Sequence, residues 1–96
     1  MAQTMIFEMP GVTQQQYDQT IDRLQLGGKP PQGQLFHVAG PMTGGWCVVD
    51  VWESQEAFDR FLQAKLAQAL QEAGMPTLQP KVIPVHNLLA REHITA

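Results

Sequence analysis

Glycine and proline residues divide this sequence into short segments, and that division constrains the fold more than any other feature. The turn pair Pro10-Gly11 ends a first apolar run, and Gly27-Gly28 ends the helical pattern that follows it. Pro30 and Pro31 then exclude both a helix interior and a central strand. The chain must therefore fold from several short elements joined by turns and loops.

The first part of the chain is expected to form a strand and a helix. Residues 5–9 are a short apolar run that suits a buried strand. Thr13 stands three residues before Gln16, which is the spacing of a capping box, and an apolar stripe at helical spacing begins at Tyr17. These features predict a helix over residues 13–26.

The second part is expected to form a hairpin, a longer helix and a last strand. Residues 35–39 and 46–53 are rich in β-forming residues, and the loop between them is short enough to close a hairpin. Ser54 is placed to cap a helix whose apolar residues recur at spacings of three and four until Gly74. Residues 82–85 form the last apolar run, and the proline inside it restricts this strand to a sheet edge.

The order of elements is strand, helix, strand, strand, helix, strand in a single domain that spans residues 1–96. This order predicts an α+β fold of the ferredoxin-like βαββαβ type, with an antiparallel sheet that carries both helices on one face. Residues 88–96 are expected to form a C-terminal tail, either helical or docked on a partner. The function is then expected to depend on what covers the second face of the sheet.

Strand alternation assigns the side chains of the hairpin to two faces. We expect the hairpin to close with Ala39 opposite Trp46 and His37 opposite Val48. The floor for the helices is then the wholly apolar face, made of Phe36, Val38, Cys47, Val49 and Val51. The other face holds Leu35, His37, Ala39, Trp46, Val48, Asp50 and Trp52. It is too apolar for open water and too polar for a plain core, so it is expected to meet a second subunit, a ligand or both.

Composition and charge exclude several classes of partner. The formal net charge is −3 and no basic run occurs, so nucleic acid is not an expected partner. No stretch approaches the roughly 20 apolar residues that span a bilayer, and no export signal is evident, so the protein is expected to be cytoplasmic. The single cysteine and the histidines lack metal-ligand spacing, so neither a metal nor a cofactor is expected.

The sequence resembles the antibiotic biosynthesis monooxygenase (ABM) domain family at residues 45–54, Gly-Trp-Cys-Val-Val-Asp-Val-Trp-Glu-Ser, together with Phe58 and Phe61-Leu62. The recurring feature of that family is a strand ending in Trp-Glu-Ser followed by a helix with an early Phe. The motif lies within about residues 45–62, although the order of elements agrees over most of the chain. The resemblance implies a homodimer, in which two ferredoxin-like units pair sheet to sheet as a dimeric α/β barrel. Such pairing would cover the face that carries both tryptophans.

Within that family the resemblance disfavours haem degradation. The haem-degrading members rely on an Asn, a Trp and a His, and Trp52 matches only the Trp of that set. No histidine lies between Glu53 and Val85, and the first strand offers no Asn. The resemblance therefore implies either a cofactor-independent oxygenase, which in this family acts on polycyclic phenols or quinols, or a binding module without catalysis.

A cofactor-independent oxygenase needs a base and an apolar, aromatic pocket. The base removes a proton from a phenol or enol, and the resulting anion reduces oxygen directly. The sequence offers His37 and His86 as bases and Asp50 as an orienting or basic carboxylate. The candidate pocket walls are Trp46, Trp52, Phe36 and Tyr17. On this interpretation the protein is a homodimeric monooxygenase-like enzyme that oxidises a small aromatic or quinol-type compound.

The same residues also fit a non-catalytic binding or structural dimer. His37 and His86 suit hydrogen-bonded histidines at a strand edge or dimer seam, and the tryptophans suit core or interface packing. Asp50 suits an interface salt bridge. The candidate partners for it are Arg23, Arg60 and Arg91. An enzyme needs an open cavity beside a histidine, whereas a structural dimer satisfies these polar residues with protein partners.

Overall fold

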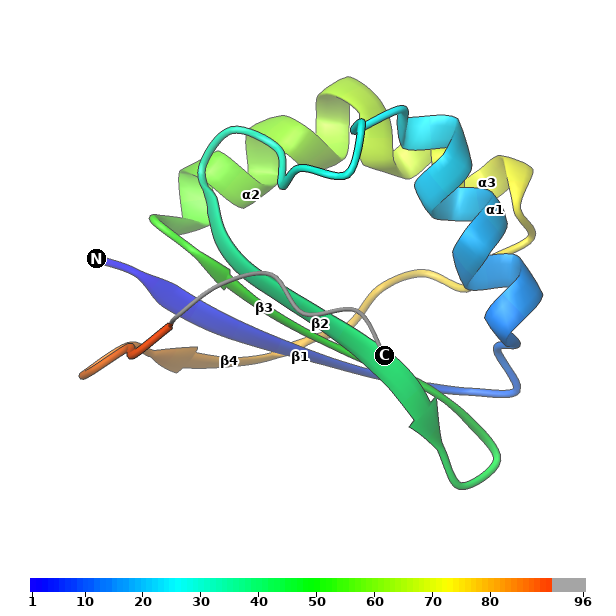
Figure 1. Ribbon diagram of the computed structural model, residues 1–96, viewed down its shortest axis with the longest axis horizontal. Helices are drawn as coiled ribbons and strands as arrows, with labels where there is room; N and C mark the ends of the chain where they lie inside the picture. The colour runs from blue at the N-terminus through cyan, green and yellow to red at the C-terminus, as the bar shows by residue number, and fades with distance from the viewer. Residues whose placement is uncertain (91–96) are drawn as a thin grey trace.

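The computed structural model describes residues 1–90 and places every helix on one face of a four-stranded sheet (Figure 1). Each neighbouring pair of strands is antiparallel, and the strand order is β2-β3-β1-β4. The strands are β1 (Gln3–Pro10), β2 (Gln34–Met42), β3 (Gly45–Trp52) and β4 (Lys81–Pro84). The predicted α+β, ferredoxin-like βαββαβ fold is confirmed.

Prolines mark both edges of the sheet, as their missing backbone donor requires. Pro84 ends β4, which pairs with β1 alone. Pro41 lies in β2, the opposite edge strand, which pairs with β3 alone. The strands β1 and β3 therefore occupy the centre of the sheet, and each pairs with a strand on both sides.

The first helix, α1 (Gln14–Leu24), begins where the capping box predicts. The Thr13 hydroxyl accepts a hydrogen bond from the Gln16 amide at 3.1 Å, and the Gln16 side chain accepts one from the Thr13 amide at 3.0 Å. The helix ends before the predicted residue 26 because Gln25 adopts the left-handed conformation at its C-terminus, with φ of 51°.

The second helical stretch has a π-helical turn in its middle. It consists of α2 (Gln55–Phe61), η1 (Leu62–Leu66) and α3 (Ala67–Glu72), and Ser54 caps its start by accepting from the Ala57 amide at 3.1 Å. A π-turn inside an α-helix recurs at functional sites. Here the π-turn joins α2 to α3, and its Leu62 and Leu66 pack against the hydrophobic core.

The hairpin register differs from the predicted one by two residues. Ala39 lies opposite Val48, and His37 lies opposite Asp50. The strand β2 continues through Met42, so only Thr43 and Gly44 form the turn, and Gly44 supplies the positive φ of 74° that the turn needs. Because the shift is an even number of residues, the paired side chains from Phe36 to Ala39 and from Trp46 to Val51 keep their predicted faces, whereas Leu35 lies at a register irregularity and has no partner.

The helices, however, cover the face that was expected to meet a partner. We call this the inner face, and its residues are Met5, Phe7, Met9, His37, Ala39, Trp46, Val48, Asp50 and Trp52. The predicted floor for the helices is instead the outer face of the sheet, made of Thr4, Ile6, Glu8, Phe36, Val38, Cys47, Val49, Val51 and Ile83. On it Phe36 and Val38 are 37% and 48% exposed. The prediction was wrong because the bulkier side chains, which fill the space beneath the helices, lie on the inner face.

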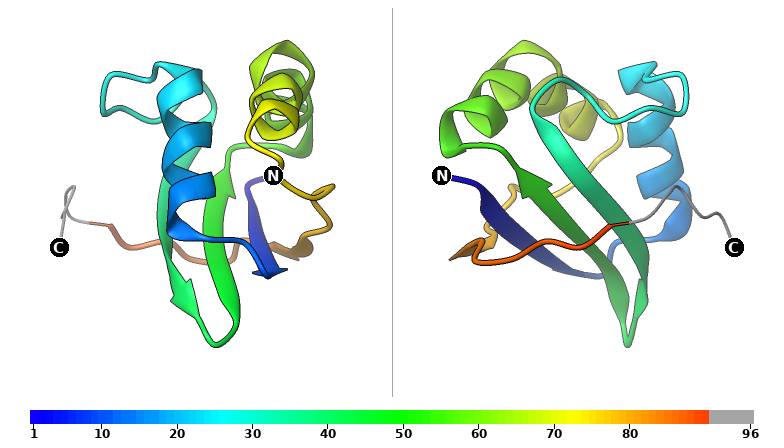
Figure 2. Two further views of the ribbon diagram at one scale, coloured as in Figure 1. Left: turned by 90° about the vertical axis from the view of Figure 1, so that its right-hand side faces the viewer. Right: turned by 60° about the vertical axis from the view of Figure 1, so that its left-hand side comes forward.

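After β4 the chain runs back across the sheet, from the β4 edge toward β2 (Figure 2). The Val85 amide donates a hydrogen bond to the Ala2 carbonyl at 3.0 Å, and residues 85–90 have no regular secondary structure (Figure 2). The predicted tail is residues 88–96, of which only 88–90 are described, and these are not helical. Among residues 1–90, no helix is long and apolar enough to cross a membrane.

Candidate functional site

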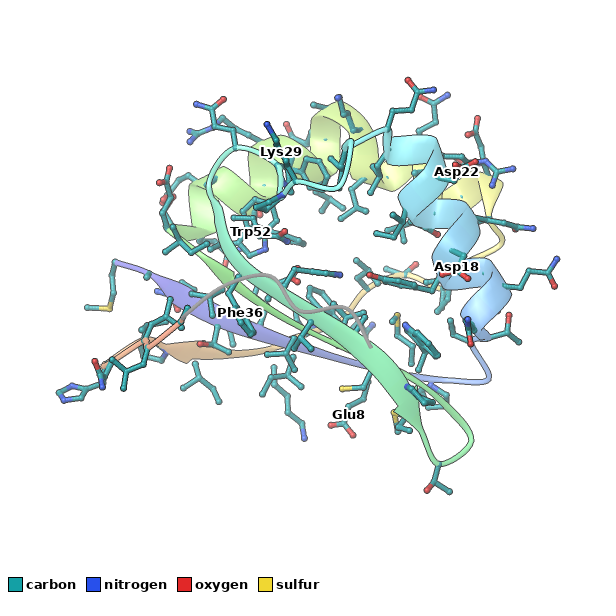
Figure 3. All side chains as sticks on the ribbon, viewed as in Figure 1. Glu8, Asp18, Asp22, Lys29, Phe36 and Trp52 are labelled. Carbon is teal, nitrogen blue, oxygen red and sulfur yellow. The ribbon has the colours of Figure 1, made fainter. Side chains whose placement is uncertain are left out.

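A cavity of about 910 Å³ lies between the helices and the inner face. The sheet contributes Phe7 and Trp52 to its walls, and Trp52 rises from β3 toward the helices in Figure 3. Phe61 and Leu66, at the two ends of the π-turn, line it from above. Residues 25–31, the connection that follows α1, also line it. Such a largely apolar cavity is suited to a small aromatic compound.

Asp50 holds a fixed position on one wall of this cavity. Its side chain is buried two residues before the end of β3, and both of its carboxylate oxygens are occupied. Oδ1 lies 2.6 Å from His37 Nδ1, directly across the hairpin, and Oδ2 accepts a hydrogen bond from Trp52 Nε1 at 3.2 Å. A buried carboxylate needs such partners, and these two come from the sheet itself.

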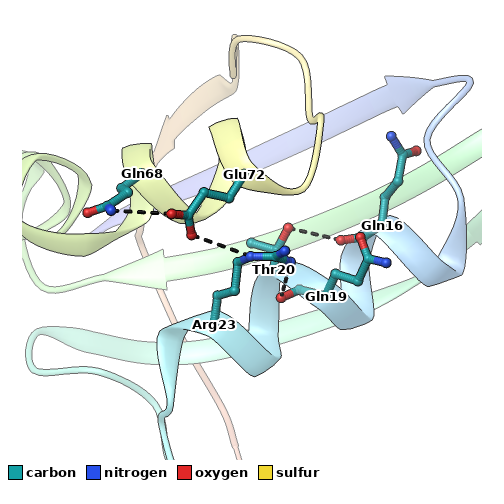
Figure 4. Close-up of polar contacts among 6 residues, drawn as sticks. All are labelled: Gln16, Gln19, Thr20, Arg23, Gln68 and Glu72. Atoms are coloured by element: carbon teal, nitrogen blue, oxygen red, sulfur yellow. Dashed lines mark hydrogen bonds and ion pairs between the residues drawn. The ribbon is translucent and has the colours of Figure 1, made fainter.

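The partners of Asp50 among the described residues are therefore not arginines. Arg23, one of the predicted partners, pairs instead with Glu72 of α3 at 3.4 Å on the surface (Figure 4). No ion pair of Arg60 is found in the described part of the chain, and Arg91 lies outside it.

His37 connects Asp50 to Tyr17. Its second ring nitrogen, Nε2, lies 2.5 Å from the Tyr17 hydroxyl oxygen. The two rings are stacked, with centroids 6.0 Å apart and planes inclined by 8°. The side chain of His37 remains 28% exposed, whereas that of Asp50 is 9% exposed. The chain of hydrogen bonds thus runs from the buried carboxylate of Asp50 through His37 to Tyr17, which lines the cavity.

The surroundings of Tyr17 keep its hydroxyl protonated. Burial, which disfavours the charged tyrosinate, and secondly the negative charges of Asp50 and Asp18 raise the pKa of Tyr17 to about 12. A protonated hydroxyl can both donate and accept, and in the neutral imidazole whose Nδ1 bonds the acceptor-only carboxylate of Asp50, Nε2 accepts from Tyr17. The other nitrogen, Nδ1, then carries the hydrogen that is donated to Asp50.

Trp46 supports Tyr17 from the side. Its ring centroid lies 5.4 Å from that of Tyr17, and its side chain is buried without lining the cavity. Within the described residues, the indole nitrogen of Trp46 has no hydrogen-bond partner. Trp46 therefore acts on the site through its packing.

The seven site residues predicted from sequence do not share one location. Tyr17, His37, Asp50 and Trp52 lie together on the cavity wall, and Trp46 packs behind Tyr17. Two remaining aromatic or basic candidates lie apart from this group. Phe36 borders the cavity from β2, but it belongs to the outer face, and His86 is exposed in the bend after β4 and does not line the cavity.

Sequence reasoning missed most of the apolar cavity wall and the contact between Tyr17 and His37. Phe58 and Phe61 belong to the apolar stripe of the helix predicted after Ser54, and both line the cavity. The helical stripe that contains them gives no signal that part of its face borders empty space. Tyr17 and His37 are 20 residues apart, and only the packing of α1 over β2 brings them together.

No cluster of three or more His, Cys, Asp or Glu side chains that could hold a metal ion occurs within residues 1–90.

A search of protein-family models finds no match to the sequence, and a search of curated proteins finds none either. The fold does match a crystal structure from Deinococcus radiodurans described as a "putative antibiotic biosynthesis monooxygenase". The TM-score is 0.61, with 12% sequence identity, and the match covers 97% of this chain and 100% of that chain. The ABM-like resemblance is therefore confirmed at the level of the fold.

Proposed function

We propose that this ABM-like domain oxidises a small aromatic or quinol-type compound with molecular oxygen, without a cofactor, and that His37 is the base. The supporting observation is the hydrogen-bonded series Asp50, His37, Tyr17 on the wall of a largely apolar cavity. A paired base and a pocket that can exclude water are the two features that this chemistry requires.

The reaction begins with loss of a proton from a phenol or enol of the substrate. The anion that results is electron-rich and transfers electrons to oxygen. For a substrate with a methylene conjugated to the phenol, R₂CH₂ and O₂ give R₂C=O and H₂O. One oxygen atom enters the product and the other leaves as water, and the substrate itself supplies all four electrons. The protein has to supply the base and the position of the ring.

Asp50 has two roles in this scheme. It holds His37 in the tautomer whose Nδ1 carries the hydrogen, and it stabilises the imidazolium that forms when Nε2 gains a proton. Trp52 fixes the second oxygen of Asp50 and also lines the cavity. Trp46 keeps Tyr17 in place by packing against it.

The experiment is a thermal-shift screen of quinols, naphthols and flavonoid-like phenols, followed by oxygen uptake for every compound that stabilises the protein. A ligand at 100 times its dissociation constant stabilises a protein by about 2.7 kcal/mol, which is readily measured. We expect His37→Gln to reduce oxygen uptake by about 100-fold or more, because a general base contributes that much. His86→Gln decides between the two predicted bases, and we expect the loss with His37→Gln alone.

The outcomes separate the enzyme from a binding module. Equal losses in His37→Gln and His86→Gln would contradict the assignment of the base to His37. Stabilisation by phenols without any oxygen uptake would contradict the oxygenase and leave a small-molecule-binding protein.

We further propose that a second copy of the chain covers the outer face, so that the functional unit is a homodimer paired through its sheets. Exposed apolar side chains on that face support this pairing, because a folded monomer rarely exposes a large contiguous patch of apolar side chains to water. They are Phe36, Val38 and Ile83. The helices would then lie on the outside of the pair, and each cavity would belong to one subunit.

A further inference from the structure

The proposed base has no ring nitrogen left for a substrate. His37 Nδ1 is bonded to Asp50 Oδ1, and Nε2 is bonded to the Tyr17 hydroxyl at 2.5 Å. A hydroxyl group has one hydrogen to donate and two lone pairs that accept. Tyr17 gives its hydrogen to His37, so its lone pairs are the acceptor that the series offers to a ligand in the cavity.

We propose that Tyr17 is a catalytic residue that relays the proton of the substrate to His37, a proposal that rests on the proposed function. The O–H bond of the substrate breaks as its proton moves to the Tyr17 oxygen. The O–H bond of Tyr17 breaks in the same step as its own proton moves to His37 Nε2. The products are a substrate anion, a neutral Tyr17 and a His37 imidazolium beside the Asp50 carboxylate. Charge and protons balance, and no oxidant takes part in this step.

The surroundings of Tyr17 favour a relay over displacement of its side chain. Its ring stacks on His37 and packs against Trp46, with centroids 6.0 and 5.4 Å away. It belongs to the first turns of α1, which the Thr13 and Gln16 capping box holds. A hydroxyl that is already aligned with its acceptor needs no reorganisation when the proton moves.

The relay also specifies the class of ligand. A compound must donate an O–H to Tyr17, so phenols and enols fit and their methyl ethers do not. We therefore expect 2-naphthol to bind more tightly than 2-methoxynaphthalene to the wild-type protein. In Tyr17→Phe this preference should disappear, because the acceptor has been removed.

The test uses 4-nitrophenol, whose visible absorption distinguishes the phenol from the phenolate. The probe is added without oxygen to the wild-type protein, Tyr17→Phe and His37→Gln, at a pH at which the probe alone is mostly neutral. We expect the bound probe to be ionised by the wild type, and its ionised fraction to fall about tenfold or more in both variants. A phenolate band that persists or grows in Tyr17→Phe overturns the relay, because the freed Nε2 would then accept the proton directly. A wild-type protein that binds the probe in its neutral form overturns it as well.

Two further measurements keep the result interpretable. Naphthalene, which has no hydroxyl, should bind equally to the wild type and Tyr17→Phe, and this equality shows that the cavity has kept its shape. Oxygen uptake separates the relay from the proposed function. A probe ionised through Tyr17, with no phenol that consumes oxygen, supports the relay and contradicts the oxygenase. Oxygen uptake that persists in Tyr17→Phe supports the oxygenase and contradicts the relay.

Discussion

The two faces of the sheet are both rich in apolar residues, yet the helices cover only one of them. The inner face combines the two tryptophans and three residues of β1 with Asp50 and His37, and the helices cover it. The outer face carries mainly smaller β-branched side chains, and Val38 on it is 48% exposed. Asp50 and His37 therefore lie on the more deeply buried face.

This difference shows that side-chain volume and mutual satisfaction, rather than average polarity, determine which face becomes the core. A buried aspartate is tolerated because His37 and Trp52 occupy both of its oxygens. The small side chains of the outer face would leave the space beneath two helices partly empty, and voids of that kind cost stability.

The strongest way to test this comparison is to truncate the larger of the two fully buried side chains of the inner face. Trp52 is 0% exposed and packs against Phe58 and Phe61, with centroids 5.5 and 5.6 Å away. We expect Trp52→Ala to lower the free energy of unfolding by about 3–5 kcal/mol, because it opens a large hole in the core. Equilibrium unfolding in urea measures this loss. Val38→Ala on the outer face is the control, and a comparable loss there would contradict the distinction between the faces.

A smaller loss is expected when only the polar centre of the inner face is removed. Asp50→Ala leaves the hydrogens of His37 Nδ1 and Trp52 Nε1 without their acceptor. An unsatisfied buried group costs about 1–3 kcal/mol, and we expect a loss of that size in the same urea experiment. Asp59→Ala is the matched control, because Asp59 is exposed on α2 and accepts only from Gln55, at 3.1 Å. If both variants lose equally little stability, Asp50 is not held by its partners as described.

The sequence predicted the order of the elements because each has a local signal. The capping box at Thr13, the cap at Ser54 and the proline of the last strand all act within a few residues of themselves. The π-turn of residues 62–66 has no such signal. It arises where the helix meets the cavity and the sheet, so it could not be read from the apolar stripe alone.

The prediction placed the helices on the wrong face of the sheet because it did not use β1 to orient the hairpin of β2 and β3. Glu8 of β1 lies opposite Cys47, so the face that carries Cys47 also carries a charged residue with solvent access. That pairing identifies the outer face, but it depends on the long-range register between β1 and β3. The site was predicted in part for the same reason: Asp50 and His37 share a hairpin, whereas Tyr17 reaches them only through the packing of α1.

The effect of the inner face on the pKa of Tyr17 can be measured directly, because Tyr17 is the only tyrosine in the sequence. Its pKa is raised from 10.0 to about 12, mainly by burial and secondly by Asp50. The folded state therefore holds the Tyr17 proton more tightly than the unfolded state does. The stability linked to this proton is complete below pH 10 and is lost as the pH rises from 10 through about 12. Near-ultraviolet absorption of the tyrosinate follows the titration.

The variants give this titration two further points of comparison. In Asp50→Ala the pKa of Tyr17 should fall, but only in part, because burial is the larger cause. In Tyr17→Phe the loss of stability between pH 10 and 12 should disappear. A native tyrosine that titrates at its ordinary pH would show that the hydroxyl is more accessible to water than the structure indicates.

A substitution on the outer face is expected to change the free energy of unfolding of a single chain least. It should instead weaken the association of two chains. Val38→Lys places a charge among exposed apolar residues, and such surface changes usually alter the free energy of unfolding by less than about 0.5 kcal/mol. Urea unfolding at low protein concentration, where the chains are separate, measures this change in the free energy of unfolding. Sedimentation velocity at high concentration should show two chains for the wild type and one for Val38→Lys, because a lysine cannot be buried unpaired between two apolar sheets. Gln19→Lys adds the same charge on the exposed side of α1 and should leave the pair intact. A wild-type protein that sediments as one chain at every concentration would mean that the outer face stays in water, and that its small apolar residues reflect strand propensity alone.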